Sequence, residues 1–255
     1  MKILKFGGTS VANAENIKRV LEIVNQKSEH DQLVVVVSAL SKVTDLLQTA
    51  AAKAASNDES FKDIVAEIEK KHLDTLKALI PVSEQSSLLS HVKRIINHLE
   101  TLLDGCFLLG ELSNRTADTI LSFGELLSSY IIAEALKQTN KNSGYKDSRE
   151  LIKTNNHFGK AAVNFEVTNQ LIRDYFAENK AQVVIMPGFI ASSLDGIITT
   201  LGRGGSDYSA AILAGALNAK VLEIWTDVNG MYTANPKIVK QAQPIATISY
   251  QEAME

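Results

Sequence analysis

The chain has 255 residues, a length that suits one large α/β domain or two small lobes, and its 45% hydrophobic and 22% charged residues are ordinary for a soluble globular protein. Its net charge of −3, with acidic and basic residues interspersed, argues against nucleic acid or an anionic membrane as the main partner. The single cysteine, Cys106, excludes an intrachain disulfide. Without a signal-peptide pattern or an uninterrupted apolar run of spanning length, we expect a cytoplasmic protein.

The first eleven residues predict a strand, a tight turn and the approach to a helix. An apolar run ends at Gly7 and Gly8, which are followed by Thr9 and Ser10. Consecutive glycines let backbone N–H groups approach an anion, and Lys5 adds a positive charge. The stretch therefore predicts a phosphate site, although an ordinary strand-to-helix turn is the alternative.

A strand–helix–strand unit opens the chain, and a long helical block follows it. Apolar residues at helical spacing predict a helix over 13–28 with Asn13 as its N-cap, and 33–37 is a continuously apolar strand. Residues 44–138 are helical in pattern and form an insertion beside the sheet. Three histidines in that insertion are too widely spaced for a compact metal site, so we expect solvated or hydrogen-bonded helix residues. These are His72, His91 and His98.

Strand patterns return after residue 143. The expected elements are extended segments after 143–144, at 151–152 and at 162–167, a helix over 168–179, a buried strand at 183–186, a hairpin over 189–200, a helix over 206–218, a strand at 221–225 and a helix starting at 250. Polar, glycine-rich loops follow the strands at 2–6, 33–37, 183–186, 197–200 and 221–225. Ligands bind at the carboxyl ends of strands in open α/β sheets, so we expect these loops to face one crevice. Strand-to-helix loops are commonly rich in Gly, Ser and Asp, which is the alternative explanation.

The segment 202–207 reads Gly-Arg-Gly-Gly-Ser-Asp and opens a helix. It completes neither a dinucleotide GxGxxG nor a Walker loop, but N–H groups at a helix start bind anions. Arg203 could clamp a carboxylate, and Asp207 could orient a lysine or hold Mg²⁺. The alternative for Asp207 is a first-turn carboxylate that is stabilised by the helix dipole.

Two further side chains are candidates for a site. Glu125 follows Gly124 within a helix, which indicates close packing or an inward carboxylate, with a solvated helix face as the alternative. In the loop 226–236, Tyr232 could stack on a base, and Lys237, the residue after this loop, could reach phosphates, although the loop also fits an ordinary hairpin.

Five segments in this order make the chain resemble aspartokinases of the amino-acid-kinase superfamily. They are residues 5–11, 36–39, 122–125, 201–208 and 226–233. The opening and the stretch 111–125 look similar to the kinase part of bifunctional aspartokinase–homoserine dehydrogenases. The resemblance implies a three-layer αβα sandwich with a mainly parallel open sheet, a substrate lobe over about 1–180 and a nucleotide lobe over about 181–255.

The resemblance also implies phosphoryl transfer from ATP with Mg²⁺ to the β-carboxylate of L-aspartate, and a homo-oligomeric full-length parent. Lys5 and Asp207 would be catalytic, with Asp207 paired to Lys5 to orient it or helping to place the metal. The aspartate site would comprise Ser38, Thr44, Glu125, Arg203 and Ser206. The ATP site would comprise Lys5, Gly7, Gly8, Ser10, Gly204, Gly205, Thr226, Asp227, Tyr232 and Lys237. The metal's ligands stay open.

Two departures from the aspartokinase pattern qualify this reading. Lys237 stands where relatives often have Arg, which keeps the charge but loses the fork geometry. The Gly-Ala-Lys nucleotide segment and the paired ACT regulatory domains are missing, so we expect a truncated, poorly active chain without readable feedback control. The alternatives are a superfamily member acting on glutamate, N-acetylglutamate, carbamate or UMP, and a non-catalytic binding fragment.

Overall fold

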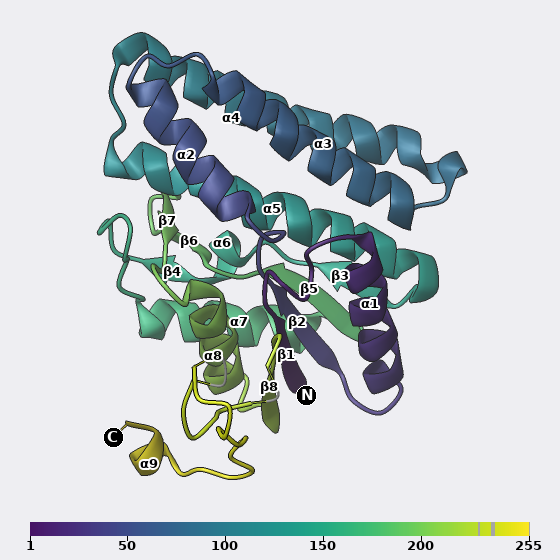
Figure 1. Cartoon of the computed structure of the whole chain (residues 1–255). Helices are drawn as coiled ribbons and strands as arrows, with labels where there is room; N and C mark the ends of the chain where they lie inside the picture. The colour runs from purple at the N-terminus through teal and green to yellow at the C-terminus, as the bar shows by residue number, and fades with distance from the viewer. Residues whose placement is uncertain (229, 236–237, 255) are drawn as a thin grey trace. The chain divides into compact units, whose positions relative to one another are not determined.

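The computed structural model describes residues 1–228, 230–235 and 238–254. Its contacts divide the chain into two compact units, Met1–Trp225 and Thr226–Glu255. The first unit contains both sheets and eight of the α-helices labelled in Figure 1, α1 to α8. The division into a substrate lobe and a nucleotide lobe near residue 180 stays a prediction.

The main sheet is five-stranded and wholly parallel. Its order is β3 (Ser143–Tyr145), β5 (Val183–Pro187), β2 (Leu33–Val37), β1 (Lys2–Phe6) and β8 (Val221–Trp225). Phe6 pairs with Val37 on one side and Trp225 on the other, and Val37 pairs with Pro187. The carboxyl ends of four strands are therefore level with one another at a single edge.

Helices cover both faces of this sheet, as Figure 1 shows. Alternate strand residues face opposite ways, so Leu4 and Val35 belong to one apolar cluster and Ile3 and Val34 to another. The first cluster includes residues of α1 (Ala14–Ser28) and α5 (Asn114–Thr139), and the second includes residues of α7 (Phe165–Glu178) and α8 (Gly205–Ala216). The predicted αβα sandwich is confirmed.

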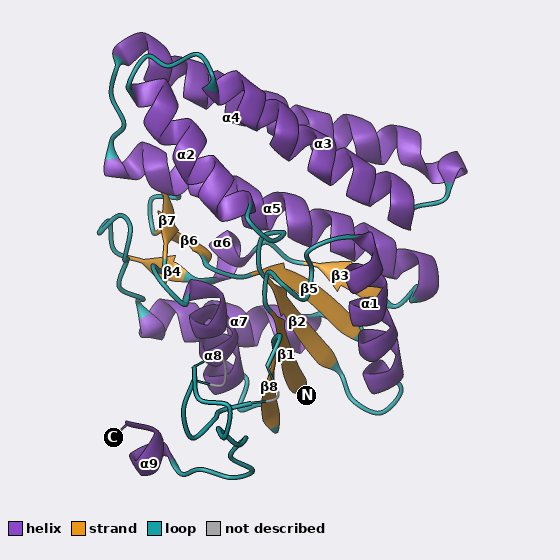
Figure 2. Ribbon diagram, viewed as in Figure 1, coloured by secondary structure: helices purple, strands orange, loops and turns teal. Residues whose placement is uncertain are grey.

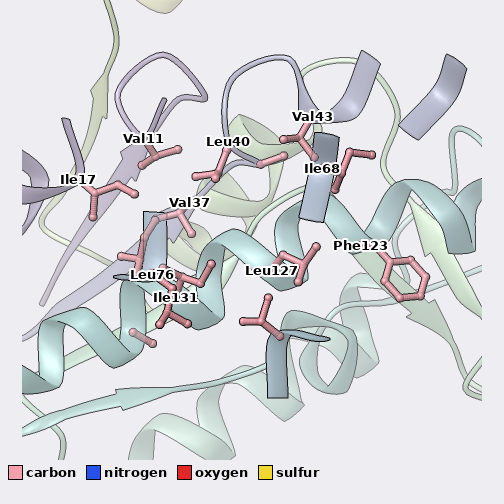
Figure 3. Packing of buried hydrophobic residues seen from close by; sticks show 14 of the residues in the cluster. Val11, Ile17, Val37, Leu40, Val43, Ile68, Leu76, Phe123, Leu127 and Ile131 are labelled. Carbon is pink, nitrogen blue, oxygen red and sulfur yellow. The ribbon is translucent and has the colours of Figure 1, made fainter. Parts of the chain in front are cut away.

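The helical block predicted over 44–138 is confirmed. It forms a helical layer on the sheet and a second layer of helices outside the first (Figure 1). It comprises α2 (Val43–Ala55), α3 (Phe61–Leu79), the short 3₁₀ turn η1 (Val82–Glu84), α4 (Gln85–Leu109) and α5. In Figure 1, α5 lies between the sheet and the layer of α2, α3 and α4. Figure 3 shows residues of this interior, among them Leu127 and Ile131 of α5.

Helix α5 has the length and composition of a membrane span, but it is a core helix of this fold. Of its most apolar 18-residue window, 72% is buried inside the protein. Leu127 and Ile131 are fully buried in the same cluster as strand residues Val37 and Ile185. Its apolarity is therefore explained by contacts on several sides.

A second, three-stranded sheet holds the predicted hairpin (Figure 2). Strands β6 (Ile190–Ser193) and β7 (Ile198–Thr200) pair antiparallel, and β4 (Lys153–Thr154) adds parallel to β6. Gly196 adopts a positive φ of 78° in the turn, a conformation that side chains disfavour. The hairpin prediction is confirmed.

The extended segments predicted at 151–152 and 162–167 are wrong in part. Leu151 ends a short helix, α6 (Ser148–Leu151), and the strand begins only at Lys153. Helix α7 begins at Phe165 because the Asn164 side chain accepts a hydrogen bond from the Val167 N–H, 3.2 Å away. This N-cap outweighs the alternating pattern, and only an isolated bridge to Val163 remains extended.

The second unit, 226–255, has little regular structure among its described residues. An antiparallel bridge joins Tyr232 and Pro244, and the predicted terminal helix is present as α9 (Tyr250–Met254).

Candidate active site

The loops after β1, β2 and β5 meet at the level edge of the main sheet, as predicted. The Gly7 N–H donates to the Trp225 carbonyl (3.1 Å), and the Gly188 N–H donates to the Val37 carbonyl (2.9 Å). Strand β7 itself belongs to the second sheet and not to the main one. The chain after β7 nevertheless returns to this edge as helix α8.

Lys5 and Asp207 form an ion pair at this edge. The Lys5 Nζ atom lies 2.8 Å from Asp207 Oδ1, and the lysine is only 7% exposed. No donor among the described residues is aligned for a hydrogen bond to Oδ1, so the contact is ionic rather than a directed hydrogen bond. The predicted pairing is confirmed. Asp207 also lies in the first turn of α8, so its helix-dipole explanation applies as well.

Tight contacts fix the start of α8 against the end of β5. A Cβ atom on Gly188 would lie 2.7 Å from the Cβ of Ser206, a separation that real side chains do not reach. The Phe189 N–H also donates to Ser209 Oγ (3.0 Å) one turn further into the helix. These contacts hold Ser206 at the carboxyl end of β5 and place Asp207 within reach of Lys5 on β1.

Glu125 is a buried carboxyl group on α5 with one oxygen unsatisfied. It is 3% exposed; the Ala39 N–H donates to its Oε1 atom (3.2 Å), and Oε2 has no hydrogen-bond partner in the described structure. Burial raises the pKa of Glu125 to about 8, while the Ala39 hydrogen bond and the positive charge of Lys5 act in the opposite direction. An inward carboxyl group is therefore confirmed, and the solvated helix face is wrong.

Gly124 explains how α5 comes so close to the loop after β2. A Cβ atom at Gly124 would lie 2.9 Å from the Ala39 Cβ atom, so no larger residue fits without movement. The Ser128 hydroxyl, on the same helix, donates to the Ser38 carbonyl at 2.8 Å. The close packing predicted from the glycine is confirmed, and it is what brings Glu125 to Ala39.

The glycine turn after β1 is folded onto its neighbours. The Ser10 hydroxyl donates to the Trp225 carbonyl at 3.2 Å, and a Cβ atom on Gly8 would lie 3.1 Å from the Ala39 carbonyl oxygen. Gly7 is buried next to Lys5. These residues lie at the predicted edge, and their contact with phosphates stays a prediction.

The other predicted aspartate ligands differ in exposure. Ser38 and Thr44 are half-buried in the loop after β2 and the first turn of α2. Arg203 is exposed, and no ion pair joins it to another side chain in the described parts of the chain. Gly204, with a φ of 73°, and Gly205 form the start of α8 directly after it. Their contact with ligands stays a prediction.

The predicted ATP ligands after residue 225 belong to the second unit. The Thr226 hydroxyl donates to Asp227 Oδ1 at 3.0 Å, and Tyr232 forms its bridge with Pro244. Lys237 lies outside the described residues. The contacts of these four residues with ATP stay predictions.

Sequence reasoning missed a second buried carboxylate on α5. Asp118 is 1% exposed and accepts hydrogen bonds from the N–H groups of Gly159 and Thr200 and from the Thr200 hydroxyl, all at 2.9–3.0 Å. One signal was available: Asp118 precedes Glu125 by seven positions, about two helical turns, and no other charged residue lies between them. Both carboxyl groups therefore lie along the same side of the helix.

The three histidines are packed or hydrogen-bonded helix residues. His72 is fully buried with Nδ1 2.7 Å from the Ile68 carbonyl oxygen, and burial lowers the pKa of His72 to about 4. His91 stacks on Tyr130 and bonds to Arg94, and His98 is an exposed residue edge-on to Phe123. The interpretation of these residues as helix residues is confirmed.

A divalent metal at this site would need ligands beyond the protein's own side chains. Across residues 1–228, 230–235 and 238–254, no three His, Cys, Asp or Glu side chains are grouped closely enough to hold a metal ion. Mg²⁺ commonly uses one or two carboxylates together with substrate phosphates and water. The half-exposed carboxylate of Asp207 fits that pattern.

The sequence profile of the amino acid kinase family matches residues 1–255, and the chain belongs to this family. It is 36% identical over 253 residues to bifunctional aspartokinase/homoserine dehydrogenase 2 of Arabidopsis thaliana, covering 98% of this chain and 27% of that protein. It is 34% identical over 256 residues to lysine-sensitive aspartokinase 3 of Escherichia coli, covering 99% of this chain and 55% of that protein.

A solved structure gives the same relationship. Aspartokinase III of Escherichia coli in complex with aspartate and ADP superposes with a TM-score of 0.86 at 31% identity. The match covers 96% of this chain and 53% of that one. The chain thus spans about a quarter to a half of the length of these relatives.

Proposed function

We propose that this chain is the catalytic domain of an aspartate kinase, transferring the γ-phosphoryl group of ATP to the β-carboxylate of L-aspartate. The product would be 4-phospho-L-aspartate, on the route to lysine, threonine and methionine. The observation that carries the proposal is the unsatisfied, buried Glu125 carboxyl group beside the edge where Lys5 and Asp207 pair. A free amino acid has an ammonium group to satisfy it, and the relatives are aspartokinases.

The amino-acid acceptor is proposed to be held by a negative side chain at its ammonium group and a positive side chain at a carboxylate. Glu125 would ionise to receive the ammonium group, since an opposite charge stabilises a buried carboxylate. Arg203 would clamp a carboxylate through two parallel hydrogen bonds. The hydroxyl groups of Ser38, Thr44 and Ser206 would complete the aspartate site.

The chemical step needs no general base, because a carboxylate is already a nucleophile. The protein has to hold two anions together and offset their repulsion. Lys5 would neutralise the charge that develops on the transferring phosphoryl group, and Asp207 would hold the lysine in place from 2.8 Å away. N–H groups of the turn at Gly7 and Gly8 would face the phosphates.

The phosphates of the nucleotide are proposed to bind at the start of α8. Gly204, Gly205 and Ser10 would approach the phosphates, helped by the positive end of the α8 dipole. The contacts to the rest of ATP would come from Thr226, Asp227, Tyr232 and Lys237. Mg²⁺ would be held by Asp207 and would supply charge neutralisation for the phosphates when bound.

A coupled ADP-release assay with a panel of acceptors tests the proposal. Turnover with aspartate above that with glutamate, N-acetylglutamate, carbamate and UMP is expected. Turnover with another acceptor and not with aspartate would assign the chain to a different activity of the family. Aspartate binding without turnover would favour a binding fragment of a longer parent. We further propose a cytoplasmic location and a homo-oligomeric parent without nucleic-acid or membrane partners.

A further inference from the structure

Asp118 joins three segments that are distant in the sequence. Its two carboxylate oxygens both accept the Gly159 N–H at 3.0 Å; Oδ2 also accepts the Thr200 N–H, and Oδ1 the Thr200 hydroxyl, each at 2.9 Å. The carboxylate thereby ties α5 to the loop at Gly159 and to the end of β7. With the group 1% exposed, water does not compete for these bonds.

The segments held by Asp118 lead directly to Arg203. The Thr200 carbonyl accepts a hydrogen bond from the Ala161 N–H at 2.9 Å. The N–H of the next residue, Leu201, donates to the Phe189 carbonyl at 2.9 Å. A Cβ atom on Gly202 would lie 3.1 Å from the Gly159 carbonyl oxygen, so the loop at Gly159 also packs on the residue before the arginine. The backbone that carries the exposed Arg203 side chain is thus held in place by Asp118.

The same helix carries the other end of the predicted acceptor site. Glu125 stands about two turns after Asp118 on the same side of α5 and contacts the loop after β2. A rigid helix therefore sets the separation between Glu125 and the backbone of Arg203. Under the proposed function, this separation has to match the distance between the acceptor's ammonium and carboxylate groups.

We infer that Asp118 is a positioning residue that fixes Arg203 relative to Glu125 and so tunes acceptor binding and acceptor length. The inference rests on the proposed function, because it takes Arg203 and Glu125 as ligands of one amino acid. Asp118 does not contact the acceptor in this scheme. It acts only through the backbone that leads to the arginine.

The test is a double-mutant cycle of Asp118→Asn and Arg203→Ala, measured by aspartate titration and steady-state kinetics on the whole chain. The asparagine amide would present N–H groups to N–H donors and disturb the loop. We expect Asp118→Asn alone to raise KM for aspartate about 10- to 100-fold, with KM for ATP and kcat changed much less. In the Arg203→Ala background, Asp118→Asn should have little further effect on aspartate affinity, within about twofold.

Two further variants keep the outcome interpretable. Thr200→Val is nearly isosteric and removes only the hydroxyl bond to Asp118, so it should weaken aspartate binding in the same direction even if Asp118→Asn fails to fold. Asp58→Asn is the control for replacing a carboxylate that accepts a backbone N–H: Asp58 accepts from the Ser60 N–H (2.9 Å) in the loop before α3, and it is half-exposed and paired with Lys53. It should leave KM for aspartate unchanged.

The possible results distinguish a failure of the positioning role of Asp118 from a failure of the proposed aspartate kinase function. Fully additive effects of Asp118→Asn and Arg203→Ala, or wild-type KM in folded Asp118→Asn and Thr200→Val, would overturn the positioning role alone. An unsubstituted chain that neither binds nor phosphorylates aspartate would overturn the proposed function, and the positioning role with it.

Discussion

Lys5 Nζ and Asp207 Oδ1 lie 2.8 Å apart, joining the penultimate residue of β1 to the first turn of α8. The lysine is buried and the aspartate half-exposed, so the positive charge is held at the sheet edge while one side of the pair stays open to a ligand. In the proposed reaction, the incoming phosphoryl group would share or replace Asp207 as the partner of Lys5. The pair places a positive and a negative charge at the level edge of the main sheet.

Replacing Lys5 by alanine tests the proposed catalytic role of this ion pair. We expect kcat for aspartate phosphorylation to fall about 100- to 1,000-fold, because a fixed charge that acts mainly in the transition state is lost. The Kd for aspartate, measured by titration, should change far less. Lys2→Ala is the control: Lys2 is on the same strand but pairs with Asp31 at 2.9 Å. An unchanged kcat in Lys5→Ala would refute the catalytic role.

Replacing Arg203 by alanine should mainly weaken aspartate binding. Loss of a charge-assisted pair costs about 1.5–3 kcal/mol, which corresponds to a Kd roughly 10- to 150-fold higher in calorimetric titration. Arg203→Lys should recover only part of this affinity, because lysine lacks the planar fork. Arg173→Ala, at an exposed arginine of α7, should bind like the unsubstituted chain. Equal affinity in Arg203→Ala would rule out the clamp.

Because Glu125 is buried, we expect its contribution to the free energy of unfolding to decrease as the pH rises. Its pKa is raised from 4.5 to about 8, so between these values the folded chain keeps the proton that the unfolded chain has released. Because the folded state binds more protons, stability decreases with pH in this window, by at most about 1.4 kcal/mol per pH unit from this group. Glu125→Gln mimics the protonated form, so its stability relative to the unsubstituted chain should increase from pH 5 to 8 in urea unfolding.

The control for this pH dependence is Glu178→Gln, at an exposed carboxylate of α7. Its stability difference from the unsubstituted chain should stay nearly flat across the same range. A flat difference for Glu125→Gln as well would mean that Glu125 is already ionised in the folded chain at pH 5. The same titration implies that aspartate affinity rises toward pH 8, since the ammonium group needs the ionised carboxylate.

Two glycines within long helices should respond oppositely to alanine. At Gly124 a Cβ atom would lie 2.9 Å from the Ala39 Cβ, so Gly124→Ala should destabilise the protein by about 1–3 kcal/mol through overpacking. At Gly105 nothing lies within 4 Å, so Gly105→Ala should stabilise α4 by up to about 1 kcal/mol. Urea denaturation measures both. Similar effects of the two substitutions would show that α5 is not closely packed on Ala39.

Local patterns predicted most of the elements correctly. The continuous apolar runs at 33–37 and 183–186 are strands covered on both faces, and the Asn13 cap and the hairpin around Gly196 lie where their turn chemistry indicates. The errors fall where alternation over a few residues is ambiguous. At 165–167 the capping bond from Val167 to Asn164 decides for a helix, and the strand pattern does not reveal that bond.

The sequence by itself determined the parallel sheet, the helical insertion and the residue types at the strand ends, because these depend on periodicity and turn chemistry that act over short distances. Only the tertiary structure decided which of those residues meet. It paired Lys5 with Asp207 through the seating of α8 on Gly188, buried Glu125 against Ala39, and placed β7 in a second sheet. It also made Asp118 the junction of three segments. Contacts between distant segments depend on helix packing and side-chain volume, which no local pattern encodes.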